Sequence, residues 1–235
     1  MGKPRTLHCK AEKIHTSEQS KSVKNKNEPL DRDRIARAAL ALIDEQGIDQ
    51  LSMRKLGSML GVEAMALYHH FRNKAELLDG ILDIVLEEVS ARLTPDGTPL
   101  ERVRRTFDGL RGISIEHPHA FLSMVSRRFR TPVSLQFYER LLQLFHEAGL
   151  TPEQSARYYR MMANFTTGAG LTEVGSRARQ PDATPVILED FNRPGEFPRI
   201  TAAMPYLRVT EIGGIYQAGM DLLFAALQAE LHSRR

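Results

Sequence analysis

The 235-residue chain contains a single cysteine and no long apolar run, and both absences narrow the range of proteins that it can be. Cys9 lies in a polar N-terminal stretch, so neither an internal disulfide framework nor a cysteine-based zinc site is available. No stretch approaches the roughly 18 apolar residues that a membrane span needs, and the polar N-terminus lacks the apolar core of a secretory signal. We therefore expect a globular, cytoplasmic protein with no membrane partner.

The sequence also lacks the short motifs that mark common enzyme classes. It has no phosphate-binding glycine loop, no histidine–glutamate metal helix and no nucleophile elbow. Gly168-Ala169-Gly170 lies in a helical pattern without a preceding strand, which is the wrong context for nucleotide binding. His117-Pro118-His119 brings two histidines together without a clear carboxylate partner. We therefore predict no enzyme, no catalytic residue, no cofactor and no metal site; catalytic turnover would favour an enzyme instead.

The net positive charge of the chain lies in its N-terminal stretch. The formal net charge is +3, but seven basic and three acidic residues give residues 1–28 a surplus of four, so the remaining chain is about neutral. A stretch rich in Lys, Ser and Asn buries too little apolar surface to offset the entropy of ordering. Residues 1–29 are thus predicted to be a disordered basic tail. It could reach along a DNA groove or phosphate backbone, or be a solubilising leader without specific contacts.

Residues 30–78 are predicted to form the first folded domain, which begins with an amphipathic helix. Asp31 and Asp33 suit a helix N-terminus, and Gly47 ends the run. The apolar residues between them recur at helical spacing, at Ile35, Ala38, Ala39, Leu42 and Ile43.

Two shorter helices follow and meet at a glycine. Ser52 is a good N-cap for a helix that Gly61 ends, and Glu63–Phe71 forms the next helix. The side chains expected to face inward are Leu56, Met59, Leu60, Val62, Leu67 and Phe71. Because glycine permits the left-handed backbone of a sharp turn, the pair is predicted to be a helix-turn-helix. Spacing alone does not decide the function, since many helical hairpins with such a glycine bind nothing.

Residues 79–235 also show helical periodicity, so an all-α fold is predicted. The apolar pattern of residues 77–89 makes a rod that ends by Thr94-Pro95-Asp96-Gly97. Further helices are predicted over Leu100–Ile115, Pro118–Phe129, Pro132–Ala148, Pro152–Ser176 (capped by Thr151) and Thr210–His232. Residues 179–205 contain five prolines and little periodicity, which predicts a long loop that could contain one short turn. That loop would either close over a pocket or simply connect two helices.

One string of side chains is far more specific than the spacing. Leu67-Tyr68-His69-His70-Phe71-Arg72-Asn73-Lys74, preceded by Leu51–Gly57 and Gly61-Val62, closely resembles the DNA-binding domain of the tetracycline-repressor (TetR) family. The resemblance covers about residues 30–80; the C-terminal two-thirds resembles the family only in length and helical character. It implies an N-terminal three-helix helix-turn-helix domain followed by a helical domain, residues 79–235, for effector binding and dimerisation.

The same resemblance implies a function. It predicts a ligand-responsive repressor that binds a palindromic double-stranded operator as a homodimer and is released by a small aromatic or apolar effector. In the family, movement of the helix after the motif changes the separation of two recognition helices, which must match major grooves about 34 Å apart. A ligand that prefers another separation therefore lowers operator affinity. The alternative is a DNA-binding activator without a releasing ligand.

The resemblance assigns several residues to bases or phosphates. Arg54 would project toward a base edge or phosphate, and a guanidinium suits the paired acceptors of guanine. Ser52 would touch phosphate as well as cap its helix, and Tyr68 and His70 match phosphate-clamping positions. Lys74 matches a position that grips phosphate and supplies affinity rather than sequence information. Arg54 could instead be a surface arginine, Ser52 only a cap, and His70 a packing histidine.

The leading turn of the recognition helix is expected to set sequence preference, because this part of the motif meets base edges. Its residues are Glu63, Ala64, Met65 and Ala66. The family often has Ser or Thr where this chain has Ala66, so apolar contact with a thymine methyl replaces a hydroxyl contact there, and Met65 could act likewise. His69 occupies an often aromatic position that faces the groove.

Small residues cluster in the last two long helices. They are Gly168, Ala169, Gly170, Gly213, Gly214, Ala218, Gly219, Ala225 and Ala226. Because glycine inside a helix costs up to about 1 kcal/mol, such clusters indicate close helix crossing. In the family these two helices from each subunit form a four-helix dimer interface; packing within one subunit is the alternative.

An effector pocket would need apolar walls and a few polar groups, and the second domain offers candidates for both. The apolar candidates to line it are Phe107, Phe121, Met124, Phe129, Phe137, Met161, Met162 and Phe165, and the polar candidates are Arg111, Arg127, Arg128 and Asn164. A semi-buried arginine would suit a phenolate or carboxylate on an otherwise apolar ligand. The apolar residues could equally be core, and the arginines a solvated helix face.

Overall fold

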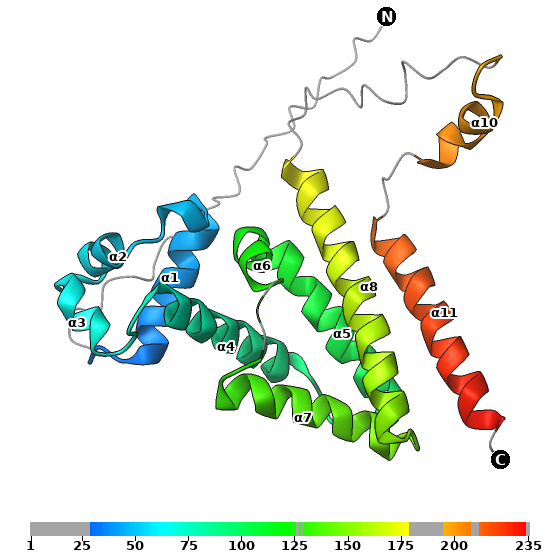
Figure 1. Cartoon of the computed structure of the whole chain (residues 1–235), viewed down its shortest axis with the longest axis horizontal. Helices are drawn as coiled ribbons and strands as arrows, with labels where there is room; N and C mark the ends of the chain where they lie inside the picture. Colours follow the sequence, from blue (N-terminus) through cyan, green and yellow to red (C-terminus); the bar gives the residue numbers. More distant parts are fainter. Residues whose placement is uncertain (1–28, 126, 128, 179–194, 208–211, 234–235) are drawn as a thin grey trace, which may run out of the picture. The chain divides into compact units, whose positions relative to one another are not determined.

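The computed structural model describes residues 29–125, 127, 129–178, 195–207 and 212–233 (Figure 1). The elements in these ranges are α-helices and one 3₁₀ turn, joined by loops, and these ranges contain no strand. The all-α prediction is therefore confirmed for the described chain. None of the described helices is long and apolar enough to cross a membrane. The predicted basic tail, except residue 29, lies outside the described residues, so its disorder and its DNA contacts stay predictions.

The first helix follows its sequence signals closely. α1 spans Arg32–Gln46, and the Asp31 carboxylate caps it by accepting a hydrogen bond from the backbone N–H of Arg34 at 2.8 Å. Gly47 ends it with a φ of +83°. The predicted inner face is buried apart from Ala38, which is half-buried.

The helix-turn-helix is formed by α2 (Met53–Leu60) and α3 (Ala64–Tyr68), after a 3₁₀ turn, η1, over Ile48–Gln50. The Ser52 hydroxyl accepts from the N–H of Lys55 at 3.2 Å, and Gly61 adopts the left-handed conformation with a φ of +72°, as predicted. Met59 is only half-buried.

The predicted bounds of the recognition helix were too wide. α3 ends at Tyr68, not Phe71, and His69 and His70 form a turn. The physical reason is a tertiary contact, because the guanidinium of Arg32 donates to the His70 carbonyl and lies 4.1 Å from the centre of the Phe71 ring. Phe71 is thereby turned into the core, where it is 1% exposed.

α4 (Lys74–Arg92) is the longest helix of the N-terminal half, and the Asn73 side chain caps it. The seven residues of the predicted apolar pattern are buried, and so is Ile84. They are Leu77, Leu78, Ile81, Leu82, Val85, Leu86 and Val89. α4 packs on α1 and also on α5 and α7, so its apolar side chains belong to two cores at once.

The remaining helices are α5 (Pro99–Glu116), α6 (Pro118–Met124), α7 (Pro132–Glu147), α8 (Pro152–Ala178), α10 (Pro198–Leu207) and α11 (Ile212–His232). Two predictions were wrong here. α6 stops five residues before Phe129, because the N–H of Arg127 closes a tight turn onto the Met124 carbonyl at 2.8 Å. The described part of the predicted loop contains the ten-residue helix α10; residues 179–194 lie outside the described residues.

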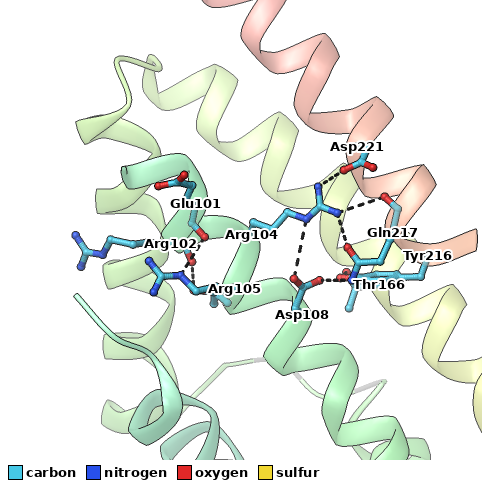
Figure 2. A network of polar contacts seen from close by, with 10 residues as sticks. Glu101, Arg102, Arg104, Arg105, Asp108, Thr166, Tyr216, Gln217 and Asp221 are labelled. Carbon is cyan, nitrogen blue, oxygen red and sulfur yellow. Dashed lines mark hydrogen bonds and ion pairs between the residues drawn. The ribbon is translucent and has the colours of Figure 1, made fainter. Parts of the chain in front are cut away.

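A second core joins α5, α7, α8 and α11 around Phe107, Phe145, Met162, Tyr216 and Met220. A polar clamp covers one edge of it. Figure 2 shows Arg104 of α5 reaching α11, where it pairs with the Asp221 carboxylate and donates to the side chain of Gln217. The Arg104 guanidinium also lies 5.6 Å from the centre of the Phe224 ring. The clamp therefore fixes α11 against α5 beside the apolar contacts.

His117, between α5 and α6, ties together three elements. Its Nδ1 lies 2.6 Å from the Asp44 carboxylate of α1, and its Nε2 lies 3.3 Å from the Glu88 carboxylate of α4. The sequence had indicated no carboxylate partner for this histidine, because both partners are distant along the chain. The hydrogen bond to Asp44, with the charges of Asp44 and Glu88, raises the pKa of His117 above its ordinary value despite burial.

This raised pKa predicts a pH-dependent stability. A histidine with a higher pKa in the folded chain stabilises it fully below the unfolded pKa of about 6.5, and the contribution is lost as the pH rises through the folded pKa. The quantity to measure is the difference in free energy of unfolding between the native chain and His117→Gln, obtained by urea denaturation. We expect the native chain to be the more stable, and this difference to be larger at about pH 6 than at about pH 8.5. The exposed His146→Gln is the control. A gap that stays constant or widens with pH would contradict the assignment.

Candidate functional site

The large apolar residues of α3 differ in exposure to solvent. Leu67 is fully buried, whereas Met65 is 66% exposed and Tyr68 is 44% exposed. A five-residue helix has little stability of its own, so packing through Leu67 holds α3 in place. Two large side chains therefore stand in solvent on a helix that is held by packing beneath it.

The ten residues predicted to contact DNA lie on or beside α2, α3 and the start of α4. The exposed ones are Ser52, Arg54, Glu63, Met65, Tyr68, His69 and Lys74, and the half-buried ones are Ala64, Ala66 and His70. The Lys74 ammonium donates to the Ile48 carbonyl at 3.1 Å, which ties the start of α4 to η1. None of the ten is fully buried, so each keeps some surface that a duplex could reach.

A partly enclosed cavity of about 300 Å³ lies among α4, α5, α6, α7 and α8. Seven of the predicted pocket residues line it, namely Phe107, Phe121, Met124, Phe129, Phe137, Arg127 and Asn164. A more open cleft of about 980 Å³ beside α5 and α11 is lined by Glu101, Arg104, Arg105 and Asp221 among others. The smaller cavity is less open than this cleft, and more aromatic rings line it, as is typical of small-molecule sites.

The sequence analysis missed several polar residues of the cavity. These are Tyr138, Tyr159, Arg160, Thr166 and Thr167. The centres of the Tyr138 and Tyr159 rings lie 4.6 Å apart, and burial raises the pKa of Tyr159 to about 12. The spacing of the cavity residues on α8 was a usable signal, because Tyr159, Ala163 and Thr166 recur on one face of that helix.

Four predicted pocket residues lie elsewhere. The Arg111 guanidinium pairs with the Glu173 carboxylate of α8 at 2.6 Å and lies 4.9 Å from the centre of the Tyr216 ring. Phe165 stacks on Tyr216 at 5.7 Å, and Met161 is 41% exposed. Met162 belongs to the core and is fully buried. Arg128 lies outside the described residues.

The small residues of α8 and α11 divide into two groups. A side chain at Gly170 would collide with the Phe121 ring, and one at Gly219 with the Phe165 ring, so these two glycines serve packing within the chain. A side chain added at Gly168 would meet nothing within 4 Å. The side chains of Ala218, Ala225 and Ala226 are exposed. Internal packing therefore explains only part of the cluster.

The two histidines around Pro118 are held by the protein. His117 contacts Asp44 and Glu88, and the Nδ1 of His119 lies 3.2 Å from the Ile43 carbonyl oxygen. Within the described ranges, no group of three or more His, Cys, Asp or Glu side chains is arranged to hold a metal ion.

Comparison with known proteins gives two family matches along the chain. Residues 35–81 match the model described as bacterial regulatory proteins, tetR family, and residues 93–231 match the tetracyclin repressor-like C-terminal domain. An HTH-type transcriptional regulator of Saccharopolyspora erythraea is 30% identical over 82% of this chain and 80% of its own length. The class A tetracycline repressor from transposon 1721 of Escherichia coli is 30% identical over 59% of this chain and 65% of its own. Among solved structures, ActR of Streptomyces coelicolor in complex with actinorhodin aligns with a TM-score of 0.74 and 27% identity, covering 86% of this chain and 97% of ActR.

Proposed function

This chain belongs to the TetR family of bacterial regulatory proteins, and from that premise we propose that it is a repressor that binds a palindromic operator as a homodimer and leaves it when an effector occupies the aromatic cavity. The observation that carries the proposal is the outward face of α3, where Met65 and Tyr68 stand exposed, together with the exposed Arg54 of α2. A supported helix with exposed side chains on its leading turn is what a major groove accepts.

Base recognition is assigned to the leading turn of α3 and to α2. Met65 and Ala66 offer apolar contact to thymine methyl groups, and Arg54 offers two parallel donors to guanine. Glu63 and Ala64 complete the turn that approaches the base edges, with His69 toward the groove. Ser52, Tyr68, His70 and Lys74 contact phosphates, so they fix register and supply affinity without reading sequence.

A homodimer is supported by an apolar stripe on α8 and α11. Leu171, Ile215 and Leu222 are 41%, 62% and 73% exposed, and small residues such as Gly168 and Ala218 accompany them. Small side chains let helices approach closely, and a two-fold arrangement presents the same stripe on both subunits. Such a dimer matches the symmetry of a palindromic operator.

Release by an effector is supported by the position of the cavity. Leu82 and Leu86 of α4 line it, and α4 also packs on α1 of the DNA-binding part. A ligand that fits one position of α4 better than another changes operator affinity by linkage. ActR, whose structure holds actinorhodin, has the same overall fold. We propose that the cavity here binds a small aromatic effector in the same part of the fold.

Substitutions on α2, α3 and α4 separate base reading from phosphate binding. Arg54→Ala is expected to weaken operator binding by about tenfold to a hundredfold and to relax base preference, because a paired contact to guanine is lost. Lys74→Ala is expected to weaken all duplexes alike and to lower the salt slope by about one. Gel-shift titrations on an operator selected from random duplexes measure the affinity, the base preference and the salt dependence. Tyr68→Ala is also expected to bind the operator more weakly.

The exposed Arg140→Ala on α7 is the control and should bind as the native chain does. Unchanged binding by Arg54→Ala, or altered base preference in Lys74→Ala, would show that these contacts are wrongly assigned.

The dimer assignment predicts that one charge in the stripe separates the subunits. Leu222→Glu on α11 is expected to give a monomer in analytical ultracentrifugation, because two buried carboxylates would face each other near the two-fold axis. Leu135→Glu on α7, a leucine that is 50% exposed, is the matched control and should leave the dimer intact. A dimeric Leu222→Glu protein would place the interface elsewhere.

A further inference from the structure

The connection between α6 and α7 grips one face of α4. The Nη1 of Arg127 donates to the Ala75 carbonyl at 3.1 Å and to the Asp79 carboxylate, and the Thr131 hydroxyl donates to the Asp83 carboxylate. Positions 75, 79 and 83 are four residues apart and so lie on one face of the helix. This face begins one residue after Lys74. The grip therefore acts on the part of α4 nearest to the helix-turn-helix.

Arg127 is one of the residues that line the cavity, and its side chain is only 17% exposed. The Nε of Arg127 is buried and has no hydrogen-bond partner among the described residues. Buried donors are normally satisfied, but this N–H has almost no accessible surface, so an acceptor in the cavity reaches it only when the Arg127 side chain moves away from Asp79.

The charge of the lining points the same way. Two arginines, Arg127 and Arg160, are among the residues that line the cavity, and no acidic residue lines it within the described part of the chain. Arg127 pairs with the Asp79 carboxylate, and Arg160 is exposed to solvent. The rest of the wall is mainly apolar, with the rings of Phe107, Phe121 and Phe137. Such a wall favours a flat apolar body, and an anionic group on that body can replace Asp79 as the partner of Arg127.

We propose that the effector is a small aromatic molecule carrying an anionic oxygen, a carboxylate or an acidic phenolate, which accepts from Arg127. This inference rests on the proposed function and names the ligand class of its cavity. The anionic oxygen competes with the Asp79 carboxylate for the same guanidinium. Occupation of the cavity thus loosens the hold of Arg127 on α4, and Arg127 is both the group that recognises the ligand and the group that couples it to the DNA-binding part.

Matched pairs of probes test the ligand class on the full-length chain. Benzoate, 2-naphthoate and anthraquinone-2-carboxylate are each compared with their primary amides, and 4-nitrophenolate with 4-nitroanisole, by calorimetric titration near neutral pH. We expect at least one anion to bind about tenfold more tightly than its neutral partner, because hydrogen bonds to charged groups are the stronger ones. The acid and phenol arms show which anionic group the cavity takes. If no anion in the series binds more tightly than its neutral partner, the proposal is overturned.

Variants then test the role of Arg127. Arg127→Gln is expected to bind the acid and the amide equally, whereas Arg130→Gln, an exposed arginine outside the cavity lining, keeps the preference. Asp79→Asn is expected to bind the acid more tightly and the amide unchanged, because the competing carboxylate is gone. Asp83→Asn, which removes a charge that does not contact Arg127, should show a smaller gain. Preference retained in Arg127→Gln, or equal gains in Asp79→Asn and Asp83→Asn, would contradict the proposal.

Two readouts keep this inference separate from the proposed function. If Arg127→Gln does not fold by circular dichroism, the comparison of Asp79→Asn with Asp83→Asn decides alone. Operator binding is measured by gel shift with and without each probe. Release by neutral compounds only would leave the repressor standing and reject the anionic effector. Arg127-dependent binding of an acid by a chain that binds no DNA would support the ligand class and reject the repressor.

Discussion

The apolar surface of α4 is the constraint on which the rest of the structure depends. Leu77, Ile81 and Val85 are fully buried, and further apolar side chains continue around the helix to Val89. A helix that is apolar on more than one face must be covered on more than one face. α1 covers one of them, and α5 and α7 cover others. A shift of the DNA-binding part therefore requires repacking of α4, whose Leu82 and Leu86 also line the cavity.

Polar contacts at the edges of α4 differ from this apolar packing because their partners can be exchanged. His117 bridges Asp44 and Glu88, and Arg127 holds Asp79. Close-packed apolar contacts favour a few discrete arrangements, whereas an ion pair can exchange one partner for another at small cost in volume. Exchange of partners at such a pair biases one arrangement of α4 over another. In this way a small ligand in a partly enclosed cavity can change the affinity of a surface that it does not touch.

Local signals in the sequence predicted the helices whose ends are set by local contacts. Asp31 and Ser52 cap their helices as expected, since a cap involves residues only three apart. Helix ends set by distant residues were missed: α3 stops at Tyr68 because Arg32 takes the His70 carbonyl. The prolines of the region before α11 suggested a loop, yet Pro198 suits the first turn of a helix and α10 forms there.

The candidate site shows the same division. The residues assigned to DNA came from one continuous motif, and the structure leaves all of them at least partly exposed, although their contacts stay predictions. The cavity is built from five helices, so residue type alone identified its phenylalanines but not Tyr159 or Arg160. Arg111 was assigned to the ligand because nothing nearby in the sequence reveals its true partner, Glu173, which is 62 residues away.

The central claim is that α3 enters a major groove and is paired with its twin by two-fold symmetry. Its most direct test is a hydroxyl-radical footprint of the full-length chain on a duplex that it selects. The account predicts an inverted repeat whose two protected halves are centred about one helical turn apart, or a multiple of it. No selected sequence, or a single protected half without its symmetric partner, would contradict it.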